Sequence, residues 1–229
     1  MTTQCPTTPH QYEDMCNVLY CKAIGLLMYA ALGICPDIAF AVMFLSQYMQ
    51  NPARMHWDAV KRVFRYLNGT QEHVLTISDH RNNQNGLRSF CNADWASQEH
   101  WHSMSGYVFT IDGSVVSWSS KKQAIVALST TEAEYVLATH AAKEALWLCT
   151  FLAEITRLLD HPTILFCDSQ SAIAIMKDNQ YHACTKHIDV QHHSSFATTS
   201  AMVTSVIYCP TANNMANIFM KLLALPKVE

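Results

Sequence analysis

The sequence predicts an α/β domain with a mixed five-stranded sheet and helices on its faces, preceded by a small all-helical region. Two observations support this expectation. Apolar residues recur at helical spacing before residue 80, whereas short strand-like runs alternate with helical stretches after residue 86. A polar stretch rich in turn formers, residues 81–86, separates the two patterns and marks a linker.

Three helices are expected before the linker. The first covers the apolar residues 19–31 and is ended by Gly33. The second begins at Pro36 and Asp37, which suit a first helical turn, and continues to Met49 before the break at Asn51. The third covers residues 57–67 and carries its apolar side chains on one face.

Five strands are expected after the linker, at residues 87–92, 105–111, 114–120, 163–167 and 203–209. Asp112 and Gly113 form the tight turn between the second and third strands. A capping box from Ser129 to Glu132 starts a long helix over residues 131–159. Shorter helices are expected at residues 171–176, 187–197 and 213–223.

Composition excludes several classes of protein. Half of the 229 residues are hydrophobic and 14% are charged, which excludes a mainly disordered chain. The longest apolar run, Ile38 to Leu45, is far shorter than the ~20 residues of a membrane span. The N-terminus does not look like a signal peptide, and no two of the nine cysteines form a CxxC pair. We therefore expect an intracellular protein with reduced thiols and no membrane partner.

Two carboxylates stand where a metal-dependent nuclease would need them. Asp168 follows a buried strand, and Glu134 lies in the first turns of the long helix, beyond Glu132, which suits the cap. Such carboxylates can hold two Mg²⁺ ions that clamp the attacking and leaving oxygens of a phosphodiester. The alternative is that Asp168 and Glu134 only cap helices.

Cationic side chains suggest contacts with nucleic acid. The third helix presents three on the side opposite its apolar face, and two more follow the third strand. They lie either on a solvated face or against a phosphate backbone. These cations are Lys61, Arg62, Arg65, Lys121 and Lys122.

From Tyr20 onward the chain resembles the C-terminal part of the Pol polyprotein of copia-type LTR retrotransposons. The resemblance lies in segments such as HWDAVKRVFRYLNGT, SWSSKKQAIVALSTTEAEY, FCDSQSAIAI and YCPTANNMANIFMKLL, which follow one another in the family's order. It implies that residues 1–80 are the end of a reverse transcriptase, from its thumb or connection region. It also implies that residues 87–229 form a ribonuclease H-like domain.

The family's ribonuclease H domain cuts the RNA strand of an RNA–DNA hybrid with two Mg²⁺ (or Mn²⁺) ions. The resemblance therefore implies an RNA–DNA hybrid or RNA as partner, together with the reverse-transcriptase palm that lies upstream in the polyprotein. By this resemblance, the family's four metal-binding carboxylates correspond to Asn92, Glu134, Asp168 and Asn217 in this sequence. Two of the four are amides here. Asp94 shares a strand face with Asn92 but lies about 6–7 Å further along, which makes it a poor substitute.

Replacing two carboxylates by amides removes two negative charges from a site that would hold two Mg²⁺ ions, which carry four positive charges. We therefore expect a catalytically impaired copy. One alternative is an active nuclease that uses Asp94, Glu134 and Asp168. Another is a host-recruited binding module, which would expose apolar side chains on the N-terminal helices. We expect Met28, Phe40, Met43 and Phe44 to form that surface.

Four histidines cluster in the sequence before the last strand. They could bind a metal ion or line a solvated helix face. Within TKHIDV, a segment that the resemblance includes, His187 could assist near the metal site. The stretch that follows, QHHSSFATTSA, has no lysine or arginine where the family has a basic helix, which also suits a lost function. The four are His182, His187, His192 and His193.

Overall fold

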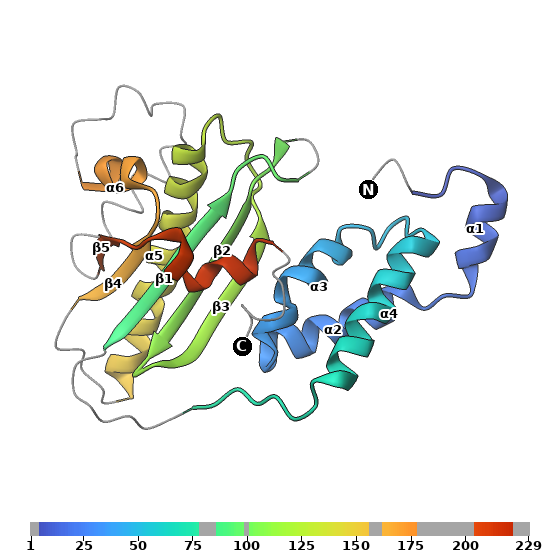
Figure 1. Cartoon of the computed structure of the whole chain (residues 1–229), viewed down its shortest axis with the longest axis horizontal. Helices are drawn as coiled ribbons and strands as arrows, with labels where there is room; N and C mark the ends of the chain where they lie inside the picture. The colour runs from blue at the N-terminus through green and yellow to red at the C-terminus, as the bar shows by residue number, and fades with distance from the viewer. Residues whose placement is uncertain (1–4, 78–85, 99–100, 156–161, 178–203, 222–229) are drawn as a thin grey trace. The chain divides into compact units, whose positions relative to one another are not determined.

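The computed structural model describes residues 5–77, 86–98, 101–155, 162–177 and 204–221 (Figure 1). It divides the chain into two compact units, one made mainly of Met1–Leu75 and the other of Thr76–Leu223. Within the described residues, no single helix is both long and apolar enough to cross a membrane. Pro9–Cys16 and Tyr20–Gly33 meet that requirement only as a pair bent by 57°.

The described residues of the first unit form helices and no strands. They are α1 (Pro9–Cys16), α2 (Tyr20–Gly33), the 3-10 turn η2 (Pro36–Ile38), α3 (Ala39–Ser46) and α4 (Arg54–Gly69). Their apolar faces meet in one core, where Ile24 of α2, Val42 of α3 and Val60 of α4 are almost fully buried. The three predicted helices are therefore present. The second is shorter than predicted, since it opens with a 3-10 turn and ends at Ser46.

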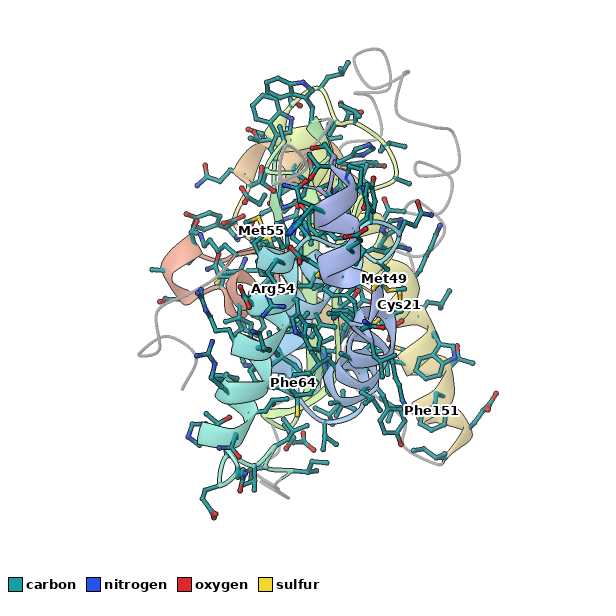
Figure 2. All side chains as sticks on the ribbon, turned by 90° about the vertical axis from the view of Figure 1, so that its right-hand side faces the viewer. Cys21, Met49, Arg54, Met55, Phe64 and Phe151 are labelled. Carbon is teal, nitrogen blue, oxygen red and sulfur yellow. The ribbon has the colours of Figure 1, made fainter. Side chains whose placement is uncertain are left out.

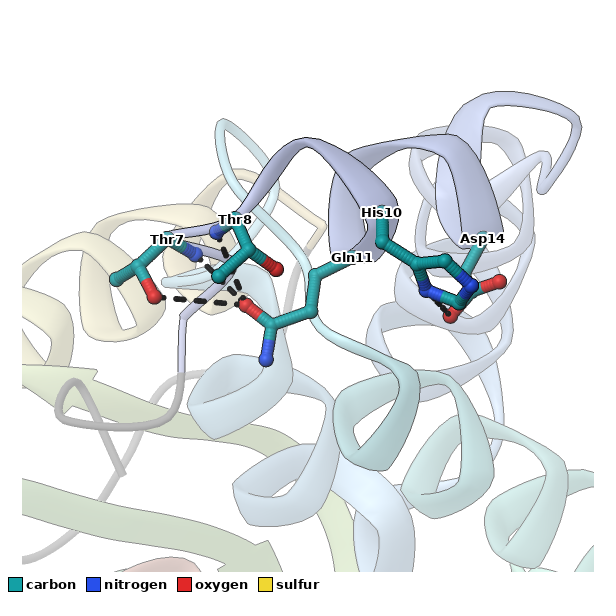
Figure 3. A network of polar contacts seen from close by, with 5 residues as sticks. All are labelled: Thr7, Thr8, His10, Gln11 and Asp14. Atoms are coloured by element: carbon teal, nitrogen blue, oxygen red, sulfur yellow. Dashed lines mark hydrogen bonds and ion pairs between the residues drawn. The ribbon is translucent and has the colours of Figure 1, made fainter.

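Helix α1 is an element that apolar spacing did not predict, because its sequence is mostly polar. Its start is fixed by Gln11, whose Oε1 accepts hydrogen bonds from the backbone N–H groups of Thr7 at 2.9 Å and Thr8 at 3.2 Å (Figure 3). His10 and Asp14 pair one turn apart at 3.4 Å. The Thr-x-x-Gln pattern of a capping box was the signal for this helix.

The segment after α3 is hydrogen-bonded to α2. The Cys21 thiol donates to the carbonyl oxygen of Met49 at 3.3 Å, and Figure 2 shows the two residues next to each other.

At the start of α4, Nδ1 of His56 accepts from the backbone N–H of Ala53 at 2.9 Å. This bond satisfies one of the free donors of the first helical turn.

The second unit is a mixed sheet with helices on its faces. Its strands are β1 (Leu87–Asp94), β2 (Met104–Ile111), β3 (Ser114–Lys122), β4 (Thr163–Cys167) and β5 (Thr204–Tyr208). The order across the sheet is β3-β2-β1-β4-β5. The first three strands pair antiparallel, whereas β4 is parallel to both β1 and β5. The predicted mixed five-stranded sheet is confirmed.

The two faces of this sheet are covered differently. Helix α5 (Thr130–Glu154) packs over one face with α6 (Gln170–Lys177), around a core that includes Phe109, Leu137 and Leu165. The 3-10 turns η5 (Thr211–Asn213) and η6 (Met215–Phe219) cross the other face, in red in Figure 1.

The predicted α-helix at residues 213–223 is wrong in type where the structure describes it, because Thr211–Asn213 and Met215–Phe219 are 3-10 turns. Asn214 separates the two turns. Its Nδ2 donates to the carbonyl oxygen of Cys91 at 2.8 Å, and its Oδ1 accepts from the backbone N–H of Ala216 at 3.0 Å. A side chain that binds both the sheet and the next turn interrupts a continuous α-helix. The long helix ends at Glu154, before the predicted Leu159, and the expected helix at 187–197 lies outside the described residues.

A close approach between the sheet and η6 depends on Gly106 of β2. A Cβ atom there would lie 2.7 Å from Cβ of Phe219 and 3.2 Å from the carbonyl oxygen of Ala216. Gly106 is also the direct cross-strand neighbour of Asn92. The missing side chain thus lets η6 reach the part of β1 that carries Asn92.

Candidate active site

Asn92 and Asn217 meet on the face of the sheet that η6 covers. Asn92 lies near the end of β1 and is buried, and its Nδ2 donates to Oδ1 of Asn217 at 3.0 Å. The Nδ2 of Asn217 donates in turn to the carbonyl oxygens of Thr211 at 2.6 Å and Asn214 at 2.9 Å. Asn217 thus accepts from Asn92 and donates to backbone oxygens in and directly after η5.

Glu134 comes to the same end of β1 from α5. The helix is capped by its neighbours: Ser129 Oγ accepts from the backbone N–H of Glu132, and Glu132 Oε2 accepts from that of Leu128. Glu134 takes no part in the cap. Its Oε1 accepts from the backbone N–H of Ala93 at 2.7 Å, across the gap between helix and sheet.

Glu134 is only 4% exposed. Burial is the main cause that raises its pKa well above the usual range, and the nearby Cys167 adds to the increase. The Cys167 thiol donates to Glu134 Oε2 at 3.6 Å. Glu134 is therefore a desolvated acid whose two oxygens both accept hydrogen bonds.

Asp168 follows β4 directly and is partly buried. Its Oδ2 accepts a hydrogen bond from the hydroxyl of Thr211 at 2.7 Å. The following helix α6 is capped by Ser169, whose Oγ accepts from the backbone N–H of Ala172 at 3.2 Å. The described contacts therefore do not support the alternative that Asp168 and Glu134 serve only as helix caps.

The structure brings the four predicted positions into one connected group. Glu134, Cys167 and Asp168 each offer a ligand atom, and these atoms lie within 4.8 Å of one another. Thr211 links Asp168 to Asn217, which binds Asn92. Glu134 thus comes to this group from α5, Asp168 from the end of β4, and the two amides from β1 and η6. Their catalytic roles stay a prediction.

Asp94 does not join the carboxylates. Within the described part of the chain, the group of potential metal ligands consists of Glu134, Cys167 and Asp168. Asp94 ends β1, where its backbone oxygen accepts from the hydroxyl of Ser97 at 3.2 Å. This position agrees with its expected failure to replace the residue at position 92.

The predicted nucleic-acid contacts lie in different parts of the chain. Lys121 is exposed and Lys122 half-buried at the end of β3, in the same unit as the carboxylates. On α4, in the other unit, Lys61 pairs with Asp58 at 2.5 Å and Arg62 is exposed. Nε of Arg65 donates to the carbonyl oxygen of Lys61 at 3.4 Å. His182, His187, His192 and His193 lie outside the described residues.

Three contributors to this group were not predicted from sequence. They are Cys167, Thr211 and Asn214. Cys167 could have been found from the sequence, because it is an inward-facing residue of β4 and directly precedes Asp168. Thr211 and Asn214 carry no local signal, because their partners are more than 40 residues away in sequence.

The donor atoms do not fit a pair of magnesium ions. Magnesium needs several charged or neutral oxygens with lone pairs free to point at the ion. Here two carboxylates remain, both oxygens of Glu134 accept hydrogen bonds, and Oδ1 of Asn217 accepts from Asn92. The set therefore lacks two of the negative charges of a two-metal centre, and hydrogen bonds use lone pairs of Glu134 and Asn217.

The exposed apolar surface of the first unit differs from the predicted one. Phe40 is buried, and Met28, Met43 and Phe44 are partly buried. Met28 packs against the helical core, and the rings of Phe40 and Phe44 stack with their centroids 6.2 Å apart. Among the exposed apolar side chains of this unit, five instead lie on or directly beside α2. They are Leu19, Leu26, Tyr29, Leu32 and Ile34.

Comparisons with known proteins identify relatives of this chain by sequence and by fold. No family model matches the chain. Secreted RxLR effector protein 161 of Plasmopara viticola is 46% identical over 135 residues, which are 58% of this chain and 94% of the effector. The N-terminal RNase H domain of rv2228c from Mycobacterium tuberculosis, a solved structure, is 12% identical with a TM-score of 0.43, covering 60% of this chain and 91% of that one.

Matches that cover nearly the whole chain are with transposon proteins. The retrovirus-related Pol polyprotein from transposon TNT 1-94 of Nicotiana tabacum is 41% identical over 226 residues, 98% of this chain and 17% of the relative. The one from transposon RE2 of Arabidopsis thaliana is 34% identical over 206 residues, 90% of this chain and 14% of the relative. The chain thus spans less than a fifth of these relatives. It belongs to the Pol polyproteins of copia-type retrotransposons.

Proposed function

We propose that residues 87–229 are a ribonuclease H-like domain whose ancestor cut the RNA strand of RNA–DNA hybrids, and that this copy has lost most or all of that cleavage. One observation carries the proposal. Asn92 and Asn217 occupy two of the four expected carboxylate positions and hydrogen-bond to each other at 3.0 Å. Catalysis by two metal ions needs charge that places the ions and stabilises the displaced oxygen.

The loss of rate follows from the chemistry of these two side chains. An amide oxygen can touch a cation but brings no net charge, and the hydrogen bond from Nδ2 of Asn92 turns Oδ1 of Asn217 toward Asn92. Each missing close ion pair weakens metal binding by a few kcal/mol, as an order of magnitude. Misplaced metal ions also remove transition-state stabilisation, which costs powers of ten in rate.

A cleavage assay on a labelled RNA–DNA hybrid tests this proposal. With Mg²⁺ or Mn²⁺, the wild-type chain is expected to give no cleavage above background, and the Asn92→Asp plus Asn217→Asp chain is expected to cut. The same double variant with Asp168→Asn is the matched control and should be silent again. Wild-type cleavage that Asp168→Asn abolishes would instead support an active nuclease that uses Asp94, Glu134 and Asp168.

Binding to nucleic acid is the second part of the proposal. We propose weak binding to RNA–DNA hybrid or RNA through Lys121 and Lys122, which end β3 in the same unit as the carboxylates. Residues 1–80 would be the remnant of a reverse transcriptase whose palm lies upstream in a longer polyprotein. Fluorescence anisotropy should show weaker binding for Lys121→Ala plus Lys122→Ala, with a smaller dependence on salt. Equal binding by both chains would remove these lysines from the interface.

A binding module is a second candidate function, favoured by two observations. The effector relative consists almost entirely of sequence matched by this chain, so a segment of this kind exists as a protein by itself. Apolar side chains are also exposed on α2, including Leu26, Tyr29 and Leu32. This candidate predicts self-association or adhesion that Leu26→Glu plus Leu32→Glu removes. A strictly monomeric wild-type chain in light scattering would count against it.

A further inference from the structure

Two exposed tryptophans lie on the loop that joins β1 to β2. Trp95 is 44% exposed and Trp101 is 73% exposed. The aromatic pairs found among the described residues include neither of these rings. Tryptophan is highly buried on average, so an exposed pair of indoles is informative. Two such rings on one loop indicate a binding surface.

The protein holds this loop in a defined shape. Nε1 of Trp95 donates to the carbonyl oxygen of Ala127 at 2.9 Å, which fixes one edge of the indole. The backbone N–H of Ala96 donates to Oγ of Ser103 at 3.2 Å, across the loop. Trp101 has a φ of 63°, in the left-handed region that bulky residues rarely adopt and that the surrounding structure must enforce. Rings that are already held in place lose little freedom when a ligand binds.

Two lysines lie at the same edge of the sheet. Asp94, Met104 and Lys122 are aligned in register across β1, β2 and β3, so Lys122 lies beside the strand ends that the loop connects. Lys121 is exposed and Lys122 is half-buried. Ammonium groups of this kind pair with phosphates. Asp94 places one opposing charge at this edge, so we expect a modest affinity.

The combination of indoles and lysines selects a class of ligand. Every nucleobase has a flat face that stacks on an aromatic ring, and every nucleotide in a strand carries a phosphate. Within a double helix the neighbouring base pairs cover these faces, so unpaired bases are the ones that can stack on a protein. The surface therefore suits a single strand better than a double-helical hybrid.

We propose that the indoles of Trp95 and Trp101 stack on unpaired bases of a single RNA or DNA strand. Lys121 and Lys122 then pair with its phosphates. The inference rests on the proposed function for these phosphate contacts and extends them to an unpaired strand. Because β1 leads from Asn92 into the loop within three residues, a strand bound there would pass close to the candidate site.

Fluorescence anisotropy with the full-length chain tests this surface. The labelled probes are a short RNA that cannot pair with itself and a DNA of the same sequence. The wild type is expected to bind both, because stacking does not read the sugar, and Trp101→Ala should bind them about 5- to 100-fold more weakly. Trp101→Phe keeps an aromatic face and should recover most of the affinity. Equal binding by the wild type and Trp101→Ala would overturn the proposal.

Trp147 provides the matched control. It lies on α5 and is 59% exposed, but its ring stacks on that of Phe151 with the centroids 5.6 Å apart. Trp147→Ala should leave single-strand binding unchanged. The difference between the wild type and Trp101→Ala should also persist at high salt, because stacking releases no counterions. A loss in Trp147→Ala as large as that in Trp101→Ala would refute the assignment to the β1–β2 loop.

A third probe, the same RNA fully paired with its DNA complement, separates this inference from the proposed function. Trp101→Ala should weaken binding of the single strands and leave binding of the hybrid unchanged. Hybrid binding that needs Lys121 and Lys122, combined with single-strand binding that is indifferent to Trp101, would refute the inference and leave the proposed function standing. Single-strand binding that needs Trp101, without any hybrid binding, would do the reverse.

A measurement on the unmutated chain decides the matter even if Trp101→Ala fails to fold. The protein is labelled with fluorotryptophan, and single Trp→Phe variants assign its fluorine NMR signals. Added single-stranded RNA should shift the signals of Trp95 and Trp101 and leave that of Trp147 in place. Shifts that arise instead from raising the protein concentration would identify a second copy of the chain as the occupant and contradict the proposal.

Discussion

Asn92 donates a hydrogen bond from Nδ2 to Oδ1 of Asn217 across 3.0 Å, joining β1 to η6 over 125 positions of sequence. Two carboxylates at these positions could not make this bond, since neither would carry a proton to donate near neutral pH. Like charges at this distance repel unless cations lie between them. The amides therefore form a contact between β1 and η6 that needs no metal ion.

Restoring both acids is expected to destabilise the metal-free protein. Asn92→Asp plus Asn217→Asp replaces a buried hydrogen bond by a like-charge pair, which we expect to lower the free energy of unfolding by about 1–3 kcal/mol in chelator. Added Mg²⁺ should recover part of this loss. The measurement is urea denaturation with and without Mg²⁺.

The matched control for this charge change is Asn17→Asp plus Asn213→Asp, at two exposed positions. We expect it to leave stability within about 0.5 kcal/mol of the wild type and to show no special response to Mg²⁺. Equal loss in both double variants would mean that net charge, and not the pairing of residues 92 and 217, sets the effect.

Gly106 is expected to tolerate no side chain. In Gly106→Ala the new Cβ would lie 2.7 Å from Cβ of Phe219, so η6 has to move away from β2. We expect a loss of about 1–3 kcal/mol in thermal or urea unfolding, as for other overpacked sites. Gly25→Ala is the control, because nothing lies within 4 Å and alanine favours the helix by up to about 1 kcal/mol. A neutral Gly106→Ala would show that η6 is not held closely against the sheet.

Burial of Glu134 should make stability depend on pH. Because its pKa is raised in the folded state, folded protein keeps the proton over a pH range in which unfolded protein has released it. The contribution is complete below about pH 4.3, the usual value for glutamate, and is lost as pH rises through the raised pKa. In chelator, wild-type stability should therefore fall relative to Glu134→Gln by up to about 1.4 kcal/mol for each pH unit. Parallel pH profiles of the two chains would contradict this expectation.

The turn between β2 and β3 should depend on glycine at one position. Asp112 and Gly113 form a two-residue loop with φ of 50° and 84°, the left-handed geometry that suits a tight hairpin. Gly113→Ala should lower stability by about 1–2 kcal/mol in urea denaturation. Gly86→Ala, with open space around it and no positive φ, serves as control and should change little. A loss confined to Gly86→Ala would point to the start of β1 and not to the hairpin.

Much of the fold could be predicted from local sequence. The alternating strands 87–94 and 104–111, the Asp112–Gly113 turn and the capped start of α5 all follow from short-range patterns. Glu132 was assigned to the cap, and its hydrogen bond to Leu128 confirms that assignment. These features rest on backbone geometry and periodicity, which a few neighbouring residues determine.

The sequence by itself determined which side chains stand at positions 92, 134, 168 and 217, and hence how much charge the candidate site carries. The tertiary structure decided what those side chains touch. The bond between Asn92 and Asn217, the hydroxyl of Thr211 on Asp168 and the thiol of Cys167 beside Glu134 all join residues far apart in the chain. The same is true of the last segment, where Asn214 binds β1 and interrupts the expected helix. Short-range patterns carry no information about such contacts, because they form only when the sheet brings distant strands to one edge.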